Sequence, residues 1–461
     1  MRHYGRDRKG AWYRIMKTPI CDFVKKYVES DALRLHMPGH KGVSFIGAEP
    51  LDITEIDGAD SLYEASGIIK QSEDTAGELF GCPTYYSTEG ASHSIRAMLY
   101  LVSLYAREKG ERPLIAAAMN VHKAFLSAAA LLDLDVQWLD FDDREGYLSC
   151  IIDARKLDAF LKNGDKKPTA IYLTSPDYLG NIADIKAISA VCKKHGVLLA
   201  VDNAHGAYLR FLTPSMHPID LGADICCDSA HKTLPALTGA AYLHISNTAP
   251  KFFVSEAKNA LALFGSTSPS YLILQSLDRL NAYLSDGYNE RLSSLAQRVN
   301  LLKNRLVEAG YILYGNEPTK ITLVTTNYGY TGIDFAKILA EKDIVCEYAD
   351  SDFIVFMLTD EIGEEGLFRL ENSLLSVPKM SAIPTDRVTV HRPERVMSIR
   401  DAMMSPCERV ITANAAGRVL AQPSVACPPA VPIAFCGEKI DEKIISAFDY
   451  YGIKELTVVK E

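Results

Sequence analysis

The stretch Val197-Leu198-Leu199-Ala200-Val201-Asp202 decides the fold, because it is a continuous apolar run that ends in a carboxylate. Similar aliphatic runs occur at residues 114–117 and 170–173, and segments with a helical spacing of apolar residues separate them. Apolar strands that alternate with helices predict an α/β fold with a mostly parallel sheet covered on both faces. In such folds ligands bind at the carboxyl ends of the strands, so the residues after each run are candidates for a site.

The second informative stretch is Asp228-Ser229-Ala230-His231-Lys232-Thr233-Leu234-Pro235, in which a lysine lies between hydroxyl and imidazole side chains. A lysine and a carboxylate such as Asp202 are the groups needed to bind pyridoxal phosphate (PLP). The lysine forms a Schiff base, and the carboxylate keeps the pyridine nitrogen protonated so that the ring accepts electrons. Most lysines beside a histidine are surface residues, so the assignment of Lys232 depends on the other candidates.

Composition and charge argue against several classes of function. The chain has 461 residues, of which 48% are hydrophobic, enough for about two or three domains. The formal net charge of -9 gives no reason to expect a nucleic-acid partner. No apolar run approaches the roughly 20 residues that cross a bilayer, so we expect no membrane segment. The ten cysteines are scattered, which indicates reduced thiols in a cytoplasmic protein, and no ligand cluster has the spacing of a zinc site, so no metal is expected.

Changes in pattern along the chain predict four parts. Residues 1–34 form an N-terminal extension and helix, and residues 35–285 form the large, ligand-binding domain. A long helical stretch from Leu280 to Glu308 leads into a smaller α+β domain at 286–383. The Pro-rich tail at 384–461 forms a C-terminal subdomain.

Two segments rich in small residues are candidates for binding a phosphate. Gly90-Ala91-Ser92-His93-Ser94 opens a helical pattern, and the free backbone N–H groups and positive dipole end of a helix attract an anion. The alternative for this segment is an ordinary serine N-cap. Phe264–Tyr271 is a hydroxyl-rich turn in which Ser268 would cap a helix that begins at Pro269, and the alternative is that the turn supplies a second contact to the phosphate.

Polar side chains follow three of the predicted strands. His122 comes after the first run and would stack on a flat ring, although most such histidines are core residues. Ser175–Gly180 comes after the next run and forms a turn. Asp202 closes a buried strand, where an unpaired carboxylate is costly and a pyridinium N–H would satisfy it, and a helix N-cap is the alternative. His205 is near enough in sequence to pack beside the same ring.

These pieces, in this order and spacing, resemble the PLP-dependent Orn/Lys/Arg decarboxylases of fold type I, the fold of aspartate aminotransferase. The likeness covers nearly the whole chain and is to the short form of the family, which lacks an N-terminal wing domain. It implies a mostly parallel sheet of the seven-stranded type and a smaller α+β C-terminal domain. The motifs that carry it are His36-Met37-Pro38-Gly39-His40-Lys41-Gly42, Asp52-Ile53-Thr54-Glu55, Gly67-Ile68-Ile69-Lys70, Asn120-x-His122-Lys123, Ser175-Pro176-x-Tyr178-x-Gly180, Asp202-x-Ala204-His205-Gly206, Ser229-x-His231-Lys232 and Ser266-Thr267-Ser268-Pro269-Ser270-Tyr271-Leu272.

The resemblance implies a role for each candidate residue. Lys232 would carry the Schiff base, and Asp202 would pair with the pyridine nitrogen. His122 would stack on the ring face, and His205 would lie near the cofactor. The remaining cofactor-binding positions would be Gly90, Ala91, Ser92, Ala204, Ser229 and His231.

The resemblance also implies an oligomer. Thr267 and Ser268 would reach the phosphate in the site of a neighbouring subunit, as in relatives that are homodimers, or higher oligomers, with sites at the interface. The segment Met16-Lys17-Thr18-Pro19 looks like the usual start of the short forms, so residues 1–15 would be an extension or a misassigned start.

The sequence departs from the family pattern at several positions. The phosphate loop usually reads Asn-Gly-(Thr/Ser)-(Thr/Ser), whereas here Glu89 adds an anion and Ala91 removes a hydroxyl. These changes bear on cofactor affinity and substrate choice but leave Lys232 and Asp202 in place. The other departures are Asp177 where threonine is common, Asn203 for a frequent glutamate, Ala430 for glycine and Cys436 for proline.

The implied activity is α-decarboxylation of a basic amino acid, arginine before lysine or ornithine, to a polyamine precursor and CO₂. The cationic end of such a substrate needs an acidic or carbonyl-lined pocket, and Glu438 in the tail is the candidate for it. Two alternatives remain. One is another fold type I enzyme, an aminotransferase or a lyase, and the other is a PLP-binding homologue without activity, for which the altered phosphate loop is the argument.

Overall fold

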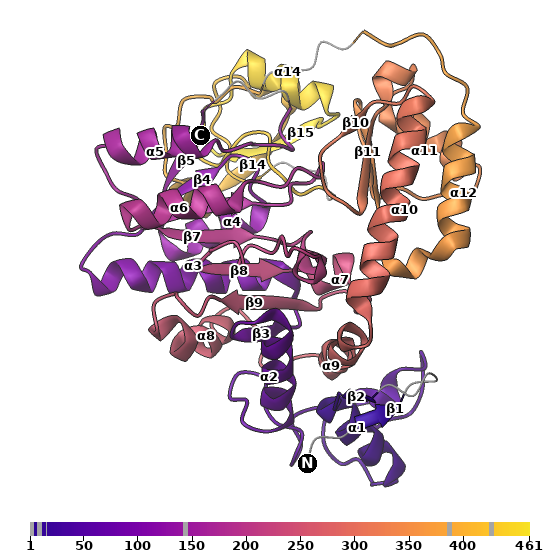
Figure 1. The fold of residues 1–461 in the computed structure, drawn as a ribbon. Helices are drawn as coiled ribbons and strands as arrows, with labels where there is room; N and C mark the ends of the chain where they lie inside the picture. Colours follow the sequence, from indigo (N-terminus) through magenta and orange to yellow (C-terminus); the bar gives the residue numbers. More distant parts are fainter. Residues whose placement is uncertain (1–3, 7–11, 15, 142–145, 385–389, 424–427) are drawn as a thin grey trace. The chain divides into compact units, whose positions relative to one another are not determined.

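The computed structural model describes residues 4–6, 12–14, 16–141, 146–384, 390–423 and 428–461 (Figure 1). The predicted extension at 1–15 lies partly outside these ranges, and the tail residue Cys427 lies wholly outside them. The chain divides into two compact units. Unit 1 consists of Met1–Leu101, Gly206–Asp220 and Asp224–Arg291, and unit 2 consists of Val102–His205, Leu221–Ala223 and Leu292–Glu461.

Helices make up much of both units. In unit 1 they are α1 (Pro19–Glu29), α2 (Ile68–Phe80), α7 (Ala230–Thr233), α8 (Phe252–Ala262), α9 (Tyr271–Ser285) and most of α3 (Gly90–Glu108). In unit 2 they are α4 (Lys123–Leu132), α5 (Ala154–Asn163), α6 (Ile185–His195), most of α10 (Tyr288–Glu308), α11 (Gly332–Ala340), α12 (Gly363–Leu375), α13 (Ile399–Met404) and α14 (Glu442–Tyr450). Short 3-10 turns are η1 (Glu49–Leu51), η2 (Ala207–Phe211), η3 (Thr325–Tyr328), η4 (Asp360–Ile362) and η5 (Thr412–Asn414).

The main sheet confirms the predicted α/β fold. Among the described residues it has seven strands, in the order β3 (Thr84–Ser87), β9 (Ala241–Ile245), β8 (Ile225–Asp228), β7 (Leu198–Asp202), β6 (Ala170–Thr174), β4 (Leu114–Ala118) and β5 (Asp135–Leu139). Strands β7, β6, β4 and β5 pair in parallel, whereas β9 runs antiparallel to both β3 and β8. The sheet is therefore mostly parallel.

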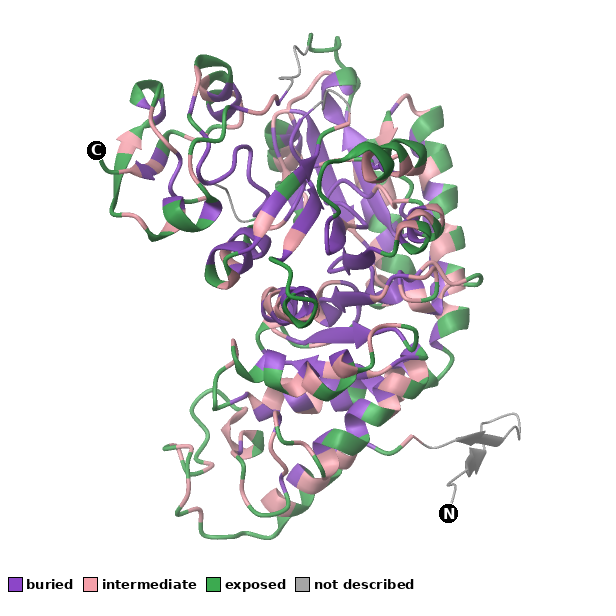
Figure 2. Cartoon of the chain, turned by 90° about the vertical axis from the view of Figure 1, so that its left-hand side faces the viewer, coloured by how far each residue is buried: buried purple, intermediate pink, exposed green. Residues whose placement is uncertain are grey.

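Burial on both faces explains why the apolar runs form strands. Every residue of β7 and of β9 is buried, and β6 is buried except at Thr174. Figure 2 shows most of the main sheet in the colour of buried residues, whereas the surrounding helices have exposed outer faces. A strand covered on both sides has no solvent face for polar residues, which is why its sequence is continuously apolar rather than alternating.

One buried carboxylate ties three helices of unit 1 together. Asp278 of α9 accepts hydrogen bonds from the backbone N–H groups of Ile20 and Cys21, both at 3.0 Å, in the first turn of α1. Its other oxygen accepts the hydroxyl of Ser72 in α2 at 2.6 Å. Burial raises the pKa of Asp278 to about 6, against an ordinary value of 3.8. A carboxylate from a distant helix thus supplies the N-terminal cap that Thr18 does not provide.

Two details of the predicted helices were wrong. The stretch Leu280–Glu308 is not one helix, because α9 ends at Ser285 and α10 begins at Tyr288 after Gly287, whose φ of +64° suits a glycine better than any other residue. The cap of α9 is Ser270 rather than Ser268, since the Ser270 hydroxyl accepts the N–H of Ile273. Pro269 therefore precedes the helix.

The C-terminal part of unit 2 contains two smaller sheets. The first is antiparallel, in the order β10 (Leu313–Tyr314), β11 (Lys320–Val324), β13 (Phe353–Met357) and β12 (Tyr348–Ala349), and it lies within residues 286–383, where the sequence predicts a smaller α+β domain. The second pairs β14 (Cys407–Ile411) with β15 (Glu455–Val459), and near the N-terminus β1 (Tyr4–Arg6) pairs with β2 (Trp12–Arg14). The four-part division of the chain stays a prediction. Among the described residues, no helix is long and apolar enough to cross a membrane.

Candidate active site

Unit 1 places the lysine of interest directly after a strand of the sheet. Strand β8 ends at Asp228, Ser229 forms the N-cap position, and Lys232 lies in the short helix α7. His231 lies beside it with Nδ1 2.8 Å from the carbonyl oxygen of Ala240. A carbonyl only accepts, so Nδ1 carries a proton and Nε2 is the atom left for a ligand. Burial, with a further contribution from Lys232, lowers the pKa of His231.

The N-terminus of α3 lies next to this histidine. A Cβ built on Gly90 would stand 4.0 Å from Cε1 of His231, so the two residues are neighbours. The N–H of Gly90 itself donates to the carbonyl of Gly239 at 2.8 Å and is therefore not one of the groups offered to a ligand. The N–H groups of Ala91 and Ser92, in the first turn of a 19-residue helix, have no acceptor within the helix. Such N–H groups at the positive end of a helix dipole favour an anion, so the prediction of a phosphate contact here stands as a prediction.

The unusual Glu89 has a structural partner. Its carboxylate accepts the backbone N–H of Ser266 at 2.6 Å, and the N–H of Ser268 in turn donates to the hydroxyl of Ser266. Glu89 thus holds the hydroxyl-rich turn beside the start of α3. Thr267 and Ser268 are exposed on that turn.

In unit 2, Asp202 is a buried carboxylate at the end of β7. It is 2% exposed, its Oδ1 accepts the N–H of Ala204 at 3.1 Å, and its Oδ2 lies 3.4 Å from the hydroxyl of Tyr172. Thr174 is its register partner on β6. Because β4, β6 and β7 are parallel, their carboxyl ends meet at one edge of the sheet, as the sequence predicts.

The same edge contains buried polar atoms without a partner in the described part of the chain. Both side-chain atoms of the Asn120 amide and the hydroxyl of Thr174 lack a hydrogen bond, and Asn120 is 1% exposed. Leaving such groups unpaired costs about 1–3 kcal/mol each. A polar molecule bound at this edge would satisfy them.

The two predicted histidines of unit 2 have defined surroundings. His122 caps α4, with Nδ1 accepting the N–H of Ala124 at 3.1 Å. His205 is 5% exposed and meets the ring of Tyr178 edge-on at 5.1 Å, and its Nδ1 lies 3.2 Å from Nζ of Lys320. The contact with Lys320 was not predicted, because 115 residues separate the two side chains.

The sequence matches the family described as "Orn/Lys/Arg decarboxylase, major domain" over residues 18–310. The chain belongs to this family. An arginine decarboxylase of Bacillus subtilis is 28% identical over 93% of this chain and 92% of its own length. The solved lysine decarboxylase of Francisella novicida has a TM-score of 0.78 at 18% identity and covers 97% of this chain and 81% of its own. Lysine decarboxylase A from Pseudomonas aeruginosa has a TM-score of 0.79 at 17% identity, with coverages of 96% and 80%.

Membership makes the protein a PLP-dependent decarboxylase of a basic amino acid, with the fold of type I PLP enzymes. Each unit, taken by itself, contains residues that suit one part of this cofactor. Unit 1 offers the lysine for covalent attachment and a helix N-terminus for the phosphate. Unit 2 offers a buried carboxylate for the pyridine nitrogen and unsatisfied polar atoms beside it. The roles of individual residues stay predictions.

Glu438 of this decarboxylase is already paired. It is 1% exposed, and one of its carboxylate oxygens accepts the N–H of Phe435 at 2.8 Å. The other oxygen is 3.2 Å from the guanidinium of Arg392. A cationic substrate would therefore have to share this carboxylate with an arginine, so its role in substrate binding stays a prediction.

A buried cluster that the sequence did not reveal includes Asp228, the last residue of the strand before the lysine-bearing helix of the decarboxylase. Nε2 of His217 and Nε2 of His244 are 3.1 and 3.2 Å from the same oxygen of Asp228, and all three residues are fully buried. Burial raises the pKa of Asp228, but the two histidines outweigh it and leave this pKa below its usual range. The N–H of Ile219 donates to Nδ1 of His217, so Nε2 of that ring carries the proton that Asp228 accepts. Although the geometry would admit a metal ion, hydrogen bonds satisfy the cluster.

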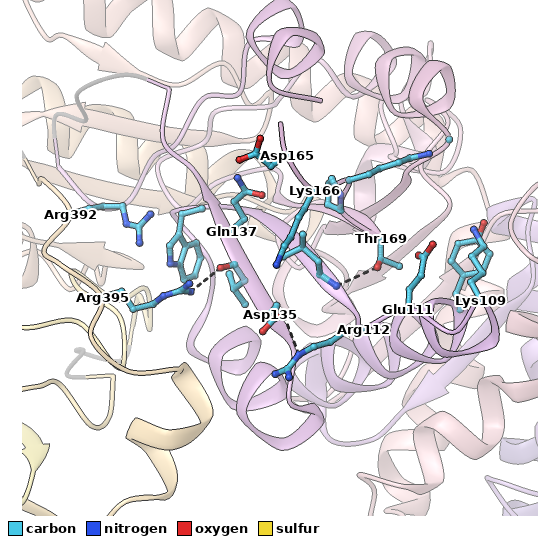
Figure 3. A pocket seen from close by; sticks show the side chains of 17 residues that line it. Lys109, Glu111, Arg112, Asp135, Gln137, Asp165, Lys166, Thr169, Arg392 and Arg395 are labelled. Carbon is cyan, nitrogen blue, oxygen red and sulfur yellow. Dashed lines mark hydrogen bonds and ion pairs between the residues drawn. The ribbon is translucent and has the colours of Figure 1, made fainter. Parts of the chain in front are cut away.

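A large cavity of the decarboxylase lies at the opposite edge of the sheet. It has a volume of about 1300 Å³ and is lined by Leu114 and Asp135, the first residues of β4 and β5 (Figure 3). Arg392 and Arg395 reach it from the C-terminal segment, and Arg395 donates to the carbonyl of Val136 at 2.9 Å. The cavity is therefore separate from the carboxyl ends of the strands where the candidate site lies.

Proposed function

We propose that this enzyme removes the α-carboxyl group of arginine to give the corresponding amine and CO₂. The observation that carries the proposal is the full-length match to a protein named arginine decarboxylase, which spans 93% of this chain. The solved lysine decarboxylases are only 17–18% identical and support the fold rather than the substrate. Lysine and ornithine are the next candidates, and the amine would be a precursor of polyamines made in the cytoplasm.

Each residue at the site has a task in this proposal. When bound, PLP supplies an electron sink for the carbon atom that loses CO₂. Lys232 would hold the cofactor covalently. Asp202 would accept the pyridinium N–H and favour the protonated nitrogen, and His122 would pack against the ring. The first-turn N–H groups of α3 and the side chains of Ser92, Ser229 and His231 would hold the phosphate.

A panel of basic amino acids tests the function. We expect the holoenzyme to release CO₂ from arginine with a higher kcat/KM than from lysine or ornithine. In the same assay Glu438→Gln should raise the KM for arginine more than it changes cofactor content, because it removes a charge that balances the guanidinium. Formation of a keto acid without CO₂ would instead identify an aminotransferase. No reaction with any of the three, at full PLP occupancy, would contradict the proposal.

We also propose that the enzyme is a homodimer. The loop after α1 exposes several large apolar side chains, including Leu33 at 84%, Leu35 at 82%, Phe45 at 77% and Ile46 at 88% exposure. Large apolar patches that face water are unusual and mark surfaces that bind another chain. The exposed Thr267 and Ser268 would then face the site of the partner. Light scattering should give twice the 50.8 kDa mass of one chain, and a double charge substitution, Phe45→Asp with Ile46→Asp, should shift it toward the monomer. A monomeric parent protein at micromolar concentration would refute the dimer.

A further inference from the structure

A buried ammonium lies behind the candidate active site of unit 2. Lys320, the first residue of β11, is 3% exposed, and its Nζ is 2.7 Å from Oε2 of Glu317. The same Nζ lies 3.2 Å from Nδ1 of His205 and 3.3 Å from the carbonyl oxygen of Asp177. The contact with Glu317 is an ion pair, whereas those with His205 and Asp177 are hydrogen bonds. An ammonium has three N–H donors and no acceptor, so it can only donate to these two groups.

These contacts determine the protonation state of His205. A group that can only donate faces Nδ1, so Nδ1 must accept, and the single ring proton is on Nε2. A second proton would place a cationic imidazole against the ammonium, which like charges at this distance disfavour. His205 is therefore a neutral imidazole with Nε2 as its donor.

Tight packing keeps the ammonium in place. The carbonyl of Gly180 accepts the N–H groups of Asn316 and Glu317 at 2.8 and 2.9 Å. Gly180 has a φ of +89°, and a Cβ on it would come within 3.1 Å of Cδ of Lys320. The turn after β6 and the segment that leads into β11 therefore pack directly on each other. The antiparallel sheet is thereby joined to the carboxyl end of the parallel strands.

The other charged groups around His205 already have ion-pair or hydrogen-bond partners. Glu317 balances Lys320, and its carbonyl accepts Nζ of Lys303 at 2.6 Å, where burial lowers the pKa of Lys303. The Asp177 carboxylate binds the backbone and side-chain N–H groups of Asn181 at 2.9 and 2.8 Å, and burial raises its pKa.

Two further ionisable groups lie close to His205 in the chain or in space. The Tyr178 ring meets its imidazole edge-on, and the Tyr178 hydroxyl donates to Glu347 at 2.7 Å. Asp202 lies at the end of the strand that leads into His205.

We propose that Lys320 is a positioning residue that holds His205 as a neutral Nε2–H donor for the cofactor throughout the working pH range. The proposal rests on the proposed function, in which His205 lies beside PLP. Lys320 does not itself touch the cofactor or the substrate in this proposal. It acts by fixing which nitrogen of His205 carries the proton and by preventing a second proton from binding.

The test compares three lysine variants of the holoenzyme. In Lys320→Met, His205 loses its donor and should titrate with an ordinary histidine pKa of about 6.5, so that kcat/KM at pH 6 falls about fourfold below its value at pH 8. Lys320→Arg restores a donor and should restore a flat profile. Lys303→Met is the matched control, because Lys303 is a partly buried lysine that contacts only the Glu317 carbonyl among the groups named here. It should leave the profile unchanged.

A second measurement reads the histidine directly. With ¹⁵N-labelled histidine, the His205 signals can be assigned by their loss in His205→Gln. They should show Nε2–H only between pH 6 and pH 8 in the parent enzyme and a titrating ring in Lys320→Met. If Lys320→Met does not fold, the double variant Lys320→Met with Glu317→Gln, which removes both charges of the ion pair, takes its place in the test.

The outcomes separate this inference from the proposed function. A His205 signal that titrates in the parent enzyme, or that is the same in parent and Lys320→Met, overturns the inference. An identical new pH dependence in Lys303→Met also overturns it, since the effect would then be a general loosening. If none of the three amino acids reacts but the histidine signals behave as expected, the proposed function fails, while the control of the His205 proton by Lys320 is supported.

Discussion

Replacing Lys232 with alanine should abolish covalent binding of PLP and reduce decarboxylation by roughly 10⁴-fold or more, the scale seen when a covalently acting group is removed. Lys232 lies in α7 directly after β8, with His231 and the N-terminus of α3 beside it. Without the amine, PLP would be held by its phosphate and ring contacts alone and would dissociate. The purified variant should lack the visible absorption band of the lysine-bound cofactor.

Two comparisons make this experiment specific. Lys25→Ala removes a lysine whose side chain is 75% exposed and should leave the absorption band and the activity unchanged. Lys232→Arg keeps a positive charge but cannot form the covalent bond, so it should be as inactive as Lys232→Ala. An unchanged absorption band in Lys232→Ala would show that another residue carries the cofactor.

Replacing Asp202 with asparagine should lower kcat by roughly 10²- to 10³-fold while changing the KM much less, by analogy with the loss of one preorganised electrostatic contact. Asparagine has nearly the same shape and still accepts the N–H of Ala204 at its oxygen. It carries no negative charge, however, so the pyridine nitrogen would lose its proton and the ring would accept electrons poorly. Rates under saturating arginine, with PLP content measured in the same samples, check this.

The matched control for Asp202 is Tyr172→Phe. It removes only the hydroxyl 3.4 Å from Oδ2, a long hydrogen bond, and leaves the charge of Asp202 intact. We expect a small change in kcat from this variant. Wild-type kcat in Asp202→Asn would contradict the pairing of Asp202 with the pyridine nitrogen, whereas a loss of bound PLP without a change in kcat per bound cofactor would assign Asp202 to affinity alone.

Much of the fold could be predicted because burial on both faces of a sheet leaves a visible trace in the sequence. The runs that form most of β4, β6 and β7 are apolar, and each is followed by polar residues of the candidate site. Their meeting at one sheet edge follows from parallel pairing alone. Asp202 was for this reason recognisable as a residue at a ligand-binding edge.

The breaks and caps of helices were less predictable. The helical pattern from Leu280 to Glu308 continues across the turn at Gly287, because both α9 and α10 bury an apolar face. Several neighbouring hydroxyl residues could each cap α9 as judged from the sequence, and in the structure Ser270 is the cap. Local patterns show which face of a helix is buried but do not show where the chain turns.

The amino-acid sequence contains the candidate residues for the proposed chemistry, since Asp202 ends the apolar strand β7 and Lys232 follows β8 in the short helix α7. The contacts of other residues near the candidate site depend on packing between distant segments. Lys320 meets His205, and Glu89 binds the turn at Ser266, because whole sheets and loops come together in a definite register. No local pattern encodes that register. The protonation state of His205 and the hydrogen bond of the Glu89 carboxylate with Ser266 therefore follow from tertiary contacts alone.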